Sequence, residues 1–116
     1  MAGETITGNK VYSFIGIAAK AGAIRSGGSV CEDTLRRGST GLLIVARDAA
    51  YNTKKKFLGL ASKKGIESRL FGTCVGLGQY CGKSHRSVML ICGESFEKRL
   101  IELIDGTAEP MDYLSR

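Results

Sequence analysis

The most informative hydrophobic pattern in the chain is the apolar run Leu42 to Ala46, which has the length and composition of a β-strand buried on both faces. The run stops at Arg47-Asp48, and a helix is predicted to begin near Asn52 or Thr53 with Lys54 to Lys56 in its first turn. Lysine is disfavoured there because a helix N-terminus already carries positive partial charge. An anionic partner would compensate, and ligands of open α/β sheets sit beyond the carboxyl ends of the strands.

Before this strand, two helices are predicted. The first covers about residues 9–21 and ends at Gly22; its apolar stripe has helical spacing and consists of Val11, Phe14, Ile15 and Ala18. A short extended piece, 23–25, leads into the turn 26–29. Ser29 and Glu32 have capping-box spacing, so the second helix should begin at Gly28 or Ser29 and end at Gly38. It is expected to bury Val30, Thr34 and Leu35 and to expose Arg36 and Arg37.

After the strand, helices and strands continue to alternate. The lysine-headed helix should end at Gly65, with Phe57, Leu60 and Ala61 in the core. The later elements are predicted as a strand at 67–71, a glycine-rich helix at about 74–81, a loop at 82–86, a strand at 87–92 and a helix at about 95–104 that buries Phe96, Leu100, Leu103 and Ile104. This order predicts an α/β fold, a three-layer α/β/α sandwich with a small mixed sheet of three or four strands. One domain, 9–105, and flexible ends at 1–8 and 106–116 are expected.

Composition and charge narrow the function. The chain has 116 residues, which is the length of one domain, and its 43% hydrophobic content can build a core. No apolar run approaches the ~20 residues of a membrane span, and the first residues have no signal-peptide pattern, so a cytoplasmic protein without a membrane partner is expected. Residues 1–93 carry 14 Lys/Arg and five Asp/Glu, whereas 94–116 carry three and six. A basic body favours nucleic acid, with an ordinary solvated surface as the alternative.

No catalytic or metal-binding group is predicted. The four cysteines form no C-x-x-C pair and have no histidine near them, so they are expected to be small buried apolar residues, with no metal, cofactor or disulfide framework. His85 has no orienting acid or nucleophile beside it and is expected to be exposed. Gly82-Lys83-Ser84 matches the tail of a phosphate loop, but Leu77 stands where that motif needs its first glycine, which argues against nucleotide hydrolysis.

The segment Lys10–Gly22 resembles the first helix of the small bacterial YlxQ-type proteins, members of the L-seven-Ae / L-thirty-e superfamily of ribosomal and RNA-binding proteins. The resemblance covers about residues 10–104. It continues in the family's order and spacing through Ser26-Gly27, Leu42–Asp48, Asn52–Lys56, Phe71–Thr73, Leu77-Gly78, Gly82-Lys83 and Ser87–Cys92. It implies an α/β/α sandwich that binds RNA kink-turns and has no enzymatic activity.

The resemblance also implies where the RNA would bind. Kink-turn binders of this superfamily carry Gly-x-Asn-Glu at the start of the second helix and a lysine three residues further on, and the Asn and Glu read sheared G·A pairs. The aligned residues here are Gly27-Gly28-Ser29-Val30, and the lysine position is Asp33. The fold match therefore extends further than the match of the site, and standard kink-turn recognition is not expected from the side chains at these positions.

The candidate RNA-binding residues each have a structural alternative. Gly27, Gly28 and Ser29 would present backbone N–H groups to phosphate, or would serve only turn geometry and a serine cap. Arg36, Arg47, Lys54 and Lys55 would contact phosphate, or would form a solvated face. Thr73, Cys74 and Val75 correspond to a loop that, in related proteins, packs against an extruded nucleotide; alternatively Thr73 caps a helix and Val75 enters the core.

Two functional hypotheses follow. The first is a non-enzymatic RNA-binding protein of the ribosome or another ribonucleoprotein, with structured RNA as partner, either a kink-turn or ribosomal RNA, and with ribosomal or other proteins as further partners. Its affinity should depend on phosphate contacts and fall steeply with salt. The second is a protein-interaction module on the same fold that has lost kink-turn RNA binding.

Overall fold

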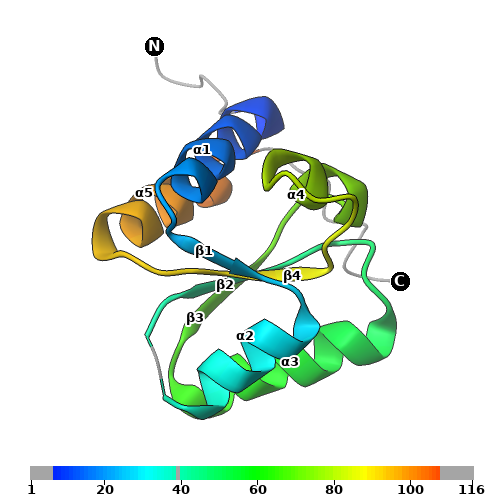
Figure 1. Ribbon diagram of the computed structural model, residues 1–116. Helices are drawn as coiled ribbons and strands as arrows, with labels where there is room; N and C mark the ends of the chain where they lie inside the picture. The colour runs from blue at the N-terminus through cyan, green and yellow to red at the C-terminus, as the bar shows by residue number, and fades with distance from the viewer. Residues whose placement is uncertain (1–6, 39, 108–116) are drawn as a thin grey trace.

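The computed structural model describes residues 7–38 and 40–107 and contains one mixed four-stranded sheet. Its strands are β1 (Ile24–Ser26), β2 (Leu42–Val45), β3 (Glu67–Leu70) and β4 (Val88–Ile91), in the spatial order β1-β4-β2-β3. β4 pairs antiparallel with both β1 and β2, whereas β2 and β3 are parallel. The carboxyl ends of β1, β2 and β3 therefore lie at the same edge of the sheet, together with the start of β4 (Figure 1).

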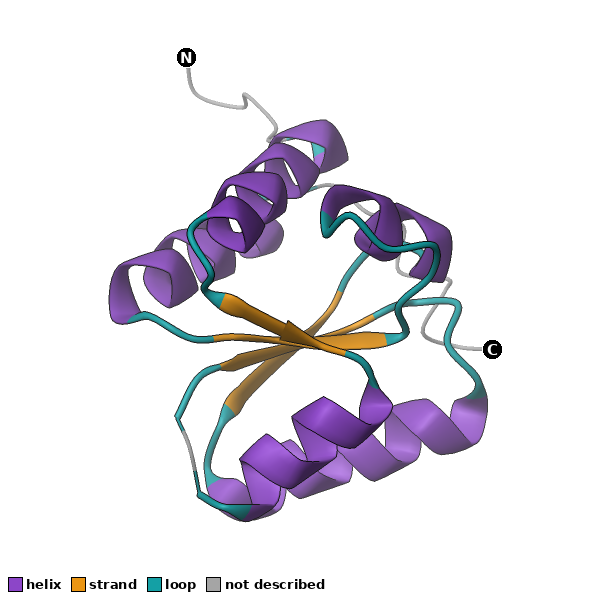
Figure 2. Ribbon diagram, viewed as in Figure 1, coloured by secondary structure: helices purple, strands orange, loops and turns teal. Residues whose placement is uncertain are grey.

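In the described part of the chain, five helices cover the two faces of this sheet. α1 (Gly8–Lys20), α4 (Cys74–Tyr80) and α5 (Glu94–Asp105) lie on one face, and α2 (Gly28–Arg36) and α3 (Tyr51–Lys64) lie on the other (Figure 1). The two helical layers and the strands between them are separated clearly in Figure 2. The prediction of a three-layer α/β/α sandwich with a small mixed sheet is confirmed.

The two central strands form the middle of the core. Every residue of β2 and β4 is buried, because helices cover both faces of each strand. Burial of a Leu or Ile side chain contributes about 1.5–3 kcal/mol, so these eight positions account for a large share of the hydrophobic stabilisation. This explains why the run 42–46 is continuous and does not alternate between apolar and polar residues.

Three glycines predicted to end helices do so. Gly22, Gly38 and Gly65 have φ angles of 74°, 83° and 70°, a left-handed conformation that glycine adopts at little cost. The core stripes of α1 and α3 are also close to the prediction, with Phe57, Leu60 and Ala61 buried in α3. α3 begins at Tyr51, so the three lysines are its fourth to sixth residues and start after its first three positions.

The predicted details of α2 were partly wrong. Gly27, with φ 99°, is the N-cap and makes no side-chain bond, so Ser29 is the second helical residue and not a cap. Val30, which was predicted to be buried, is 46% exposed. Cys31 is buried instead, because a helix that starts at Gly28 turns Cys31 and Leu35 toward the sheet. In α5, Phe96 is only half-buried; it packs beside Phe14, with 5.7 Å between ring centroids.

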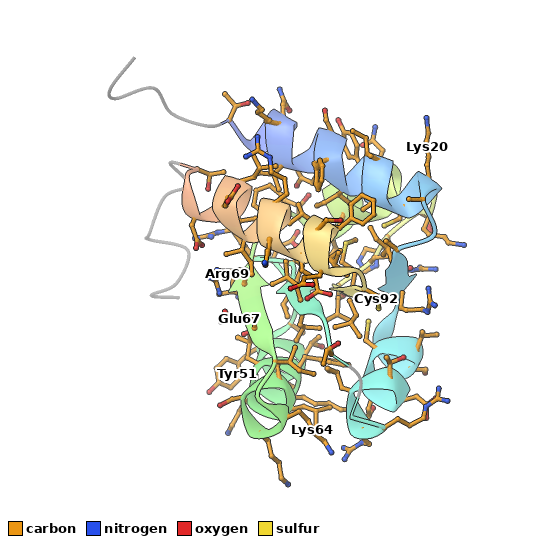
Figure 3. The ribbon with its side chains drawn as sticks, turned by 90° about the vertical axis from the view of Figure 1, so that its left-hand side faces the viewer. Lys20, Tyr51, Lys64, Glu67, Arg69 and Cys92 are labelled. Carbon is orange, nitrogen blue, oxygen red and sulfur yellow. The ribbon has the colours of Figure 1, made fainter. Side chains whose placement is uncertain are left out.

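The far edge strand is joined to α5 by an ion pair. Arg69 of β3 donates from Nε to Asp105 Oδ1 at 2.8 Å and from Nη2 to Asp105 Oδ2 at 3.1 Å. Glu67 lies on the same strand and accepts from Arg69 Nη1 at 2.9 Å (Figure 3). These contacts raise the pKa of Arg69 and place its charge in a structural role at β3.

The expected flexible ends cannot be compared in full, because residues 1–6 and 108–116 lie outside the described residues. Within the described part, α1 begins one residue before the expected boundary, at Gly8. None of the described helices is both long enough and apolar enough to span a bilayer.

Candidate nucleic-acid interface

Four segments that are distant in the sequence meet at the edge where β1, β2 and β3 end. We define the strand-end edge as residues 26–29, 46–48, 71–75 and 85–87. Backbone hydrogen bonds join these segments: Gly27 N to Val88 O at 3.1 Å, Ala46 N to Ser87 O at 2.8 Å, Arg47 N to Gly72 O at 2.8 Å and Arg86 N to Cys74 O at 3.0 Å. The structure therefore brings seven predicted site residues to one place: Gly27, Gly28, Ser29, Arg47, Thr73, Cys74 and Val75.

The start of α2 presents unoccupied backbone donors at this edge. Gly27 turns the chain out of β1 with φ 99°, and Gly28 and Ser29 are exposed. Within the described residues, no group accepts a hydrogen bond from the N–H of Gly28, Ser29 or Val30. A helix N-terminus with open N–H groups and little side-chain bulk suits a phosphate oxygen.

The start of α4, at the same edge, is occupied by protein groups. Thr73 Oγ1 accepts from Gly76 N at 2.9 Å, so the predicted alternative of a threonine cap is confirmed. Asp48 Oδ1 accepts from Cys74 N at 2.8 Å, across 26 positions of sequence. Tyr12 Oη accepts from Thr73 N at 3.0 Å. Three of the backbone donors at the start of α4 are thus used inside the fold, unlike those of α2.

The loop before α4 divides between surface and core. Val75 is 61% exposed, so the alternative that placed it in the core was wrong. Cys74 is buried and its Sγ lies 3.5 Å from Ser87 Oγ, which leaves its side chain out of reach of a nucleotide. Of the two residues expected to pack against an extruded base, only Val75 is available.

Arg86 belongs to this edge but was not among the candidate site residues. Its Nε donates to Ser26 Oγ at 3.1 Å and its Nη1 to His85 O at 2.8 Å, which holds the guanidinium beside the start of α2. A Cβ at Gly27 would lie 3.8 Å from Arg86 Nε. The only sequence signal for this residue was the basic loop containing Lys83, His85 and Arg86. Arg86 is 60 positions from Ser26, so no local pattern predicted their contact.

Two glycines of α4 are explained by close packing. A Cβ at Gly78 would lie 2.5 Å from the backbone nitrogen of His85, and a Cβ at Gly76 would lie 2.4 Å from Tyr12 Oη. Lys83 N also donates to Gly78 O at 2.8 Å. Gly76 and Gly78 therefore allow α1 and the 82–87 loop to approach α4.

The basic residues of the α2–α3 layer differ in position. Lys54 and Lys55 lie in the part of α3 nearest the strand-end edge, and within the described residues neither makes an ion pair. Arg36 lies at the opposite end of α2 and pairs with Glu32 at 3.0 Å. Lys56 pairs with the same carboxylate at 2.8 Å. Hydrogen bonds from Lys56, and to a smaller extent from Arg36, lower the pKa of Glu32. Arg36 therefore lies away from the strand-end edge, unlike Lys54 and Lys55, because it is the last residue of α2.

Arg47 is half-buried directly after β2. Its Nη1 donates to Leu70 O at 3.4 Å, which holds the side chain against the end of β3.

Across residues 7–38 and 40–107, no cluster of three or more His, Cys, Asp or Glu side chains is placed to hold a metal ion. All four cysteines are free thiols; Cys31 and Cys74 are buried and Cys81 and Cys92 are half-buried.

A profile of the ribosomal protein L7Ae/L30e/S12e/Gadd45 family matches residues 9–101. The chain belongs to this family. Among curated members of the L7Ae family, it is 25% identical over 100 residues to the RNA-binding protein YlxQ of Bacillus subtilis (strain 168), covering 86% of this chain and 100% of that protein. It is 31% identical over 97 residues to the RNA-binding protein YlxQ of Enterococcus faecium, covering 84% and 93%. The resemblance to YlxQ-type proteins is therefore confirmed.

Solved structures agree with this membership. A protein of unknown function from Bacillus halodurans C superposes with a TM-score of 0.78 and 31% identity, covering 83% of this chain and 97% of that one. The Giardia lamblia 15.5kD RNA binding protein superposes with a TM-score of 0.70, covering 84% and 83%, and at 21% identity this likeness shows the fold alone.

Proposed function

We propose that this chain is a non-enzymatic RNA-binding protein that holds structured RNA against the strand-end edge. The observation that carries the proposal is the difference between the two helix starts at this edge: three donors at the start of α4 are occupied by Asp48, Thr73 and Tyr12, whereas those of α2 are open beside Arg86. Both curated relatives are named RNA-binding proteins, which supports the same conclusion.

In this proposal, residues 9–105 act as one domain and phosphate contacts provide most of the affinity. The backbone N–H groups of Gly28 and Ser29 bind one phosphate, and the guanidinium of Arg86 binds the same or a neighbouring one. Lys54 and Lys55 extend the positive surface along α3. Because each neutralised phosphate releases counterions, affinity falls steeply as the salt concentration rises.

The side chains at positions 29 and 30 are poorly suited to recognise the bases of a kink-turn. Ser29 and Val30 replace the Asn and Glu that the resemblance implies, and exposed Val30 offers an apolar contact without a hydrogen bond to a base edge. Asp33, at the expected lysine position, is paired with Arg37, which reduces its repulsion of phosphate. We therefore infer recognition of RNA shape and backbone, with ribosomal RNA or another ribonucleoprotein RNA as the natural class of target.

The experiment compares binding to a kink-turn RNA and to an unbent RNA duplex at low and moderate salt. Salt-sensitive binding to both, with little preference for the kink, is expected. Strong kink selectivity would contradict the inferred loss of base reading, and absence of binding to both RNAs at low salt would contradict RNA binding itself.

A substitution at the start of α2 tests the location. Ser29→Glu places a carboxylate in the first turn of a helix, which favours helix stability but repels phosphate. At least tenfold weaker RNA binding is expected, on the order of the effect of a misplaced charge at a phosphate site. Ser95→Glu is the matched control, because Ser95 is also the second residue of its helix and exposed, but α5 begins at the opposite edge of the sheet. Equal binding by the two variants would place the RNA elsewhere.

The alternative of a protein-interaction module has an observation of its own, an apolar groove beside α1. The groove lies in the helical layer formed by α1, α4 and α5. A protein bound there would leave the strand-end edge open for RNA.

A further inference from the structure

A groove of about 640 Å³ lies between α1 and α4, on the face of the sheet opposite α2 (Figure 1). Ile17 and Tyr80 line it and are 55% and 38% exposed, and Gly16 forms part of its surface. A Cβ at Gly16 would lie 3.7 Å from Tyr80 O, an ordinary van der Waals distance, so α1 and α4 lie close together on this side of the groove. Exposed apolar side chains that lie together around a hollow are typical of a binding surface.

A second hollow, of about 200 Å³, lies on the other side of Ile17 between α1 and α5. Phe14 and Leu103 line it, and Ile17 contributes to both hollows. Ile17 is therefore a ridge between two apolar depressions on one continuous face. A partner helix that lies across this face can place one apolar side chain on each side of Ile17, as in helix-in-groove recognition.

A positively charged lysine lies at each end of this face. Lys10 lines the α1–α5 hollow and Lys20 lines the α1–α4 groove, where it marks the end of α1 (Figure 3). Within the described residues neither lysine makes an ion pair, and no Asp or Glu lines either hollow. Ten residues of α-helix separate the two lysines by about 15 Å. A partner helix with acidic residues about ten positions apart matches this spacing.

Other occupants fit less well. One face of Tyr80 is covered by Tyr12, with ring centroids 4.9 Å apart and 19° between the ring planes, so at most the other face can stack a nucleotide base. A second copy of this face would bring lysines against lysines. α1 contains no acidic residue that would offset this repulsion.

We propose that the face formed by α1 with α4 and α5 binds a short amphipathic helix of a protein partner, with apolar side chains on both sides of Ile17 and acidic side chains at Lys10 and Lys20. This surface is separate from the proposed RNA site, so one molecule can hold an RNA and a protein together.

The probe is a synthetic helical peptide of about 14 residues, near the length at which isolated helices become stable. It carries leucines at helical spacing on one face and glutamates about ten positions apart, and a sister peptide carries lysines in place of the glutamates. With the full chain labelled for NMR, saturable shifts confined to residues 10–20, 79–82 and 99–103 are expected from the acidic peptide alone. Equal binding of both peptides, or shifts centred on the strand-end edge, would overturn the proposal.

Two pairs of variants test the residues. Ile17→Asp should weaken peptide binding at least tenfold, whereas Val30→Asp, at an aliphatic residue of similar exposure on the opposite layer, should leave it unchanged. Lys20→Glu should weaken binding roughly fivefold at low salt, as expected for reversal of an exposed charge, and Lys63→Glu on α3 should not. An amide spectrum that is unchanged away from the substituted position shows that each variant is folded.

Two further outcomes would assign the face to another occupant. Duplex RNA that shifts the same residues and competes with the peptide would make this face a second RNA surface and would refute the protein-partner proposal. Concentration-dependent dimers that Ile17→Asp abolishes would show that a second copy occupies it. Loss of RNA binding in Ser29→Glu with peptide binding retained would show that the two surfaces are independent.

Discussion

The phenolic oxygen of Tyr12 accepts a hydrogen bond from the backbone N–H of Thr73 at 3.0 Å, across 61 positions of sequence. The same ring lies against Phe71 and stacks on Tyr80, so it joins α1 to both ends of α4. Tyr12 thereby fixes the start of α4 at the strand-end edge and one wall of the apolar groove. One side chain positions parts of both proposed surfaces.

Tyr12→Phe is expected to destabilise the protein by about 1 kcal/mol, because the N–H of Thr73 loses its acceptor while the aromatic packing remains. Tyr51→Phe is the matched control; Tyr51 is 71% exposed and its hydroxyl makes no contact within the described residues, so its loss should cost almost nothing. Urea unfolding followed by circular dichroism measures both. Equal stabilities of the two variants would show that the bond contributes little.

Gly78→Ala is expected to destabilise the fold by more than 1 kcal/mol, because a Cβ there would lie 2.5 Å from the His85 backbone nitrogen and must displace the loop. Gly59→Ala is the contrasting change, since a Cβ at this α3 position meets nothing within 4 Å. It should stabilise the protein by about 0.5–1 kcal/mol through helix propensity. Thermal unfolding of both variants is the measurement, and shifts of the same sign would contradict the packing argument.

Arg86→Gln is expected to weaken RNA binding about three- to tenfold and to reduce the slope of log affinity against log salt by about 1, because one phosphate contact is lost. Arg36→Gln removes the same charge at the far end of α2, where Arg36 already pairs with Glu32, and should change binding little. Titrations at several salt concentrations separate the two. Equal losses would indicate a diffuse basic surface in place of a defined edge.

Alkaline pH should destabilise the protein through Cys31. Burial raises the pKa of this thiol from 9.0 to about 12, so its ionisation in the folded state is suppressed. A group whose pKa is raised by folding contributes full stability below pH 9, and this contribution is lost as the pH rises toward 12. The slope reaches about 1.4 kcal/mol per pH unit for one thiol.

The measurement for Cys31 is the free energy of unfolding between pH 7 and 10, compared between the natural chain and Cys31→Ala. Cys31→Ala should lose less stability as the pH rises, because it lacks the buried thiol. The other titratable groups are the same in both proteins. Parallel pH curves for the two proteins would exclude Cys31 as the source.

The sequence by itself determined the elements and their alternation. The continuous run 42–46 specified a strand buried on both faces, helical spacing specified the stripes of α1 and α3, and Gly22, Gly38 and Gly65 specified where three helices end. The threonine cap at Thr73 was also readable. Each of these signals acts within a few residues, through side-chain periodicity or backbone conformation, so a linear pattern carries it.

The tertiary structure alone decided which residues share a surface. Asp48 binds the N–H of Cys74, Arg86 binds Ser26, and Arg36 lies away from the strand-end edge. The exposure of Val30 and the groove beside Ile17 also follow from how whole helices sit on the sheet. The two hydrogen bonds join residues 26 and 60 positions apart. Local hydrophobic patterns do not predict such pairs, because the residues meet only when the layers pack.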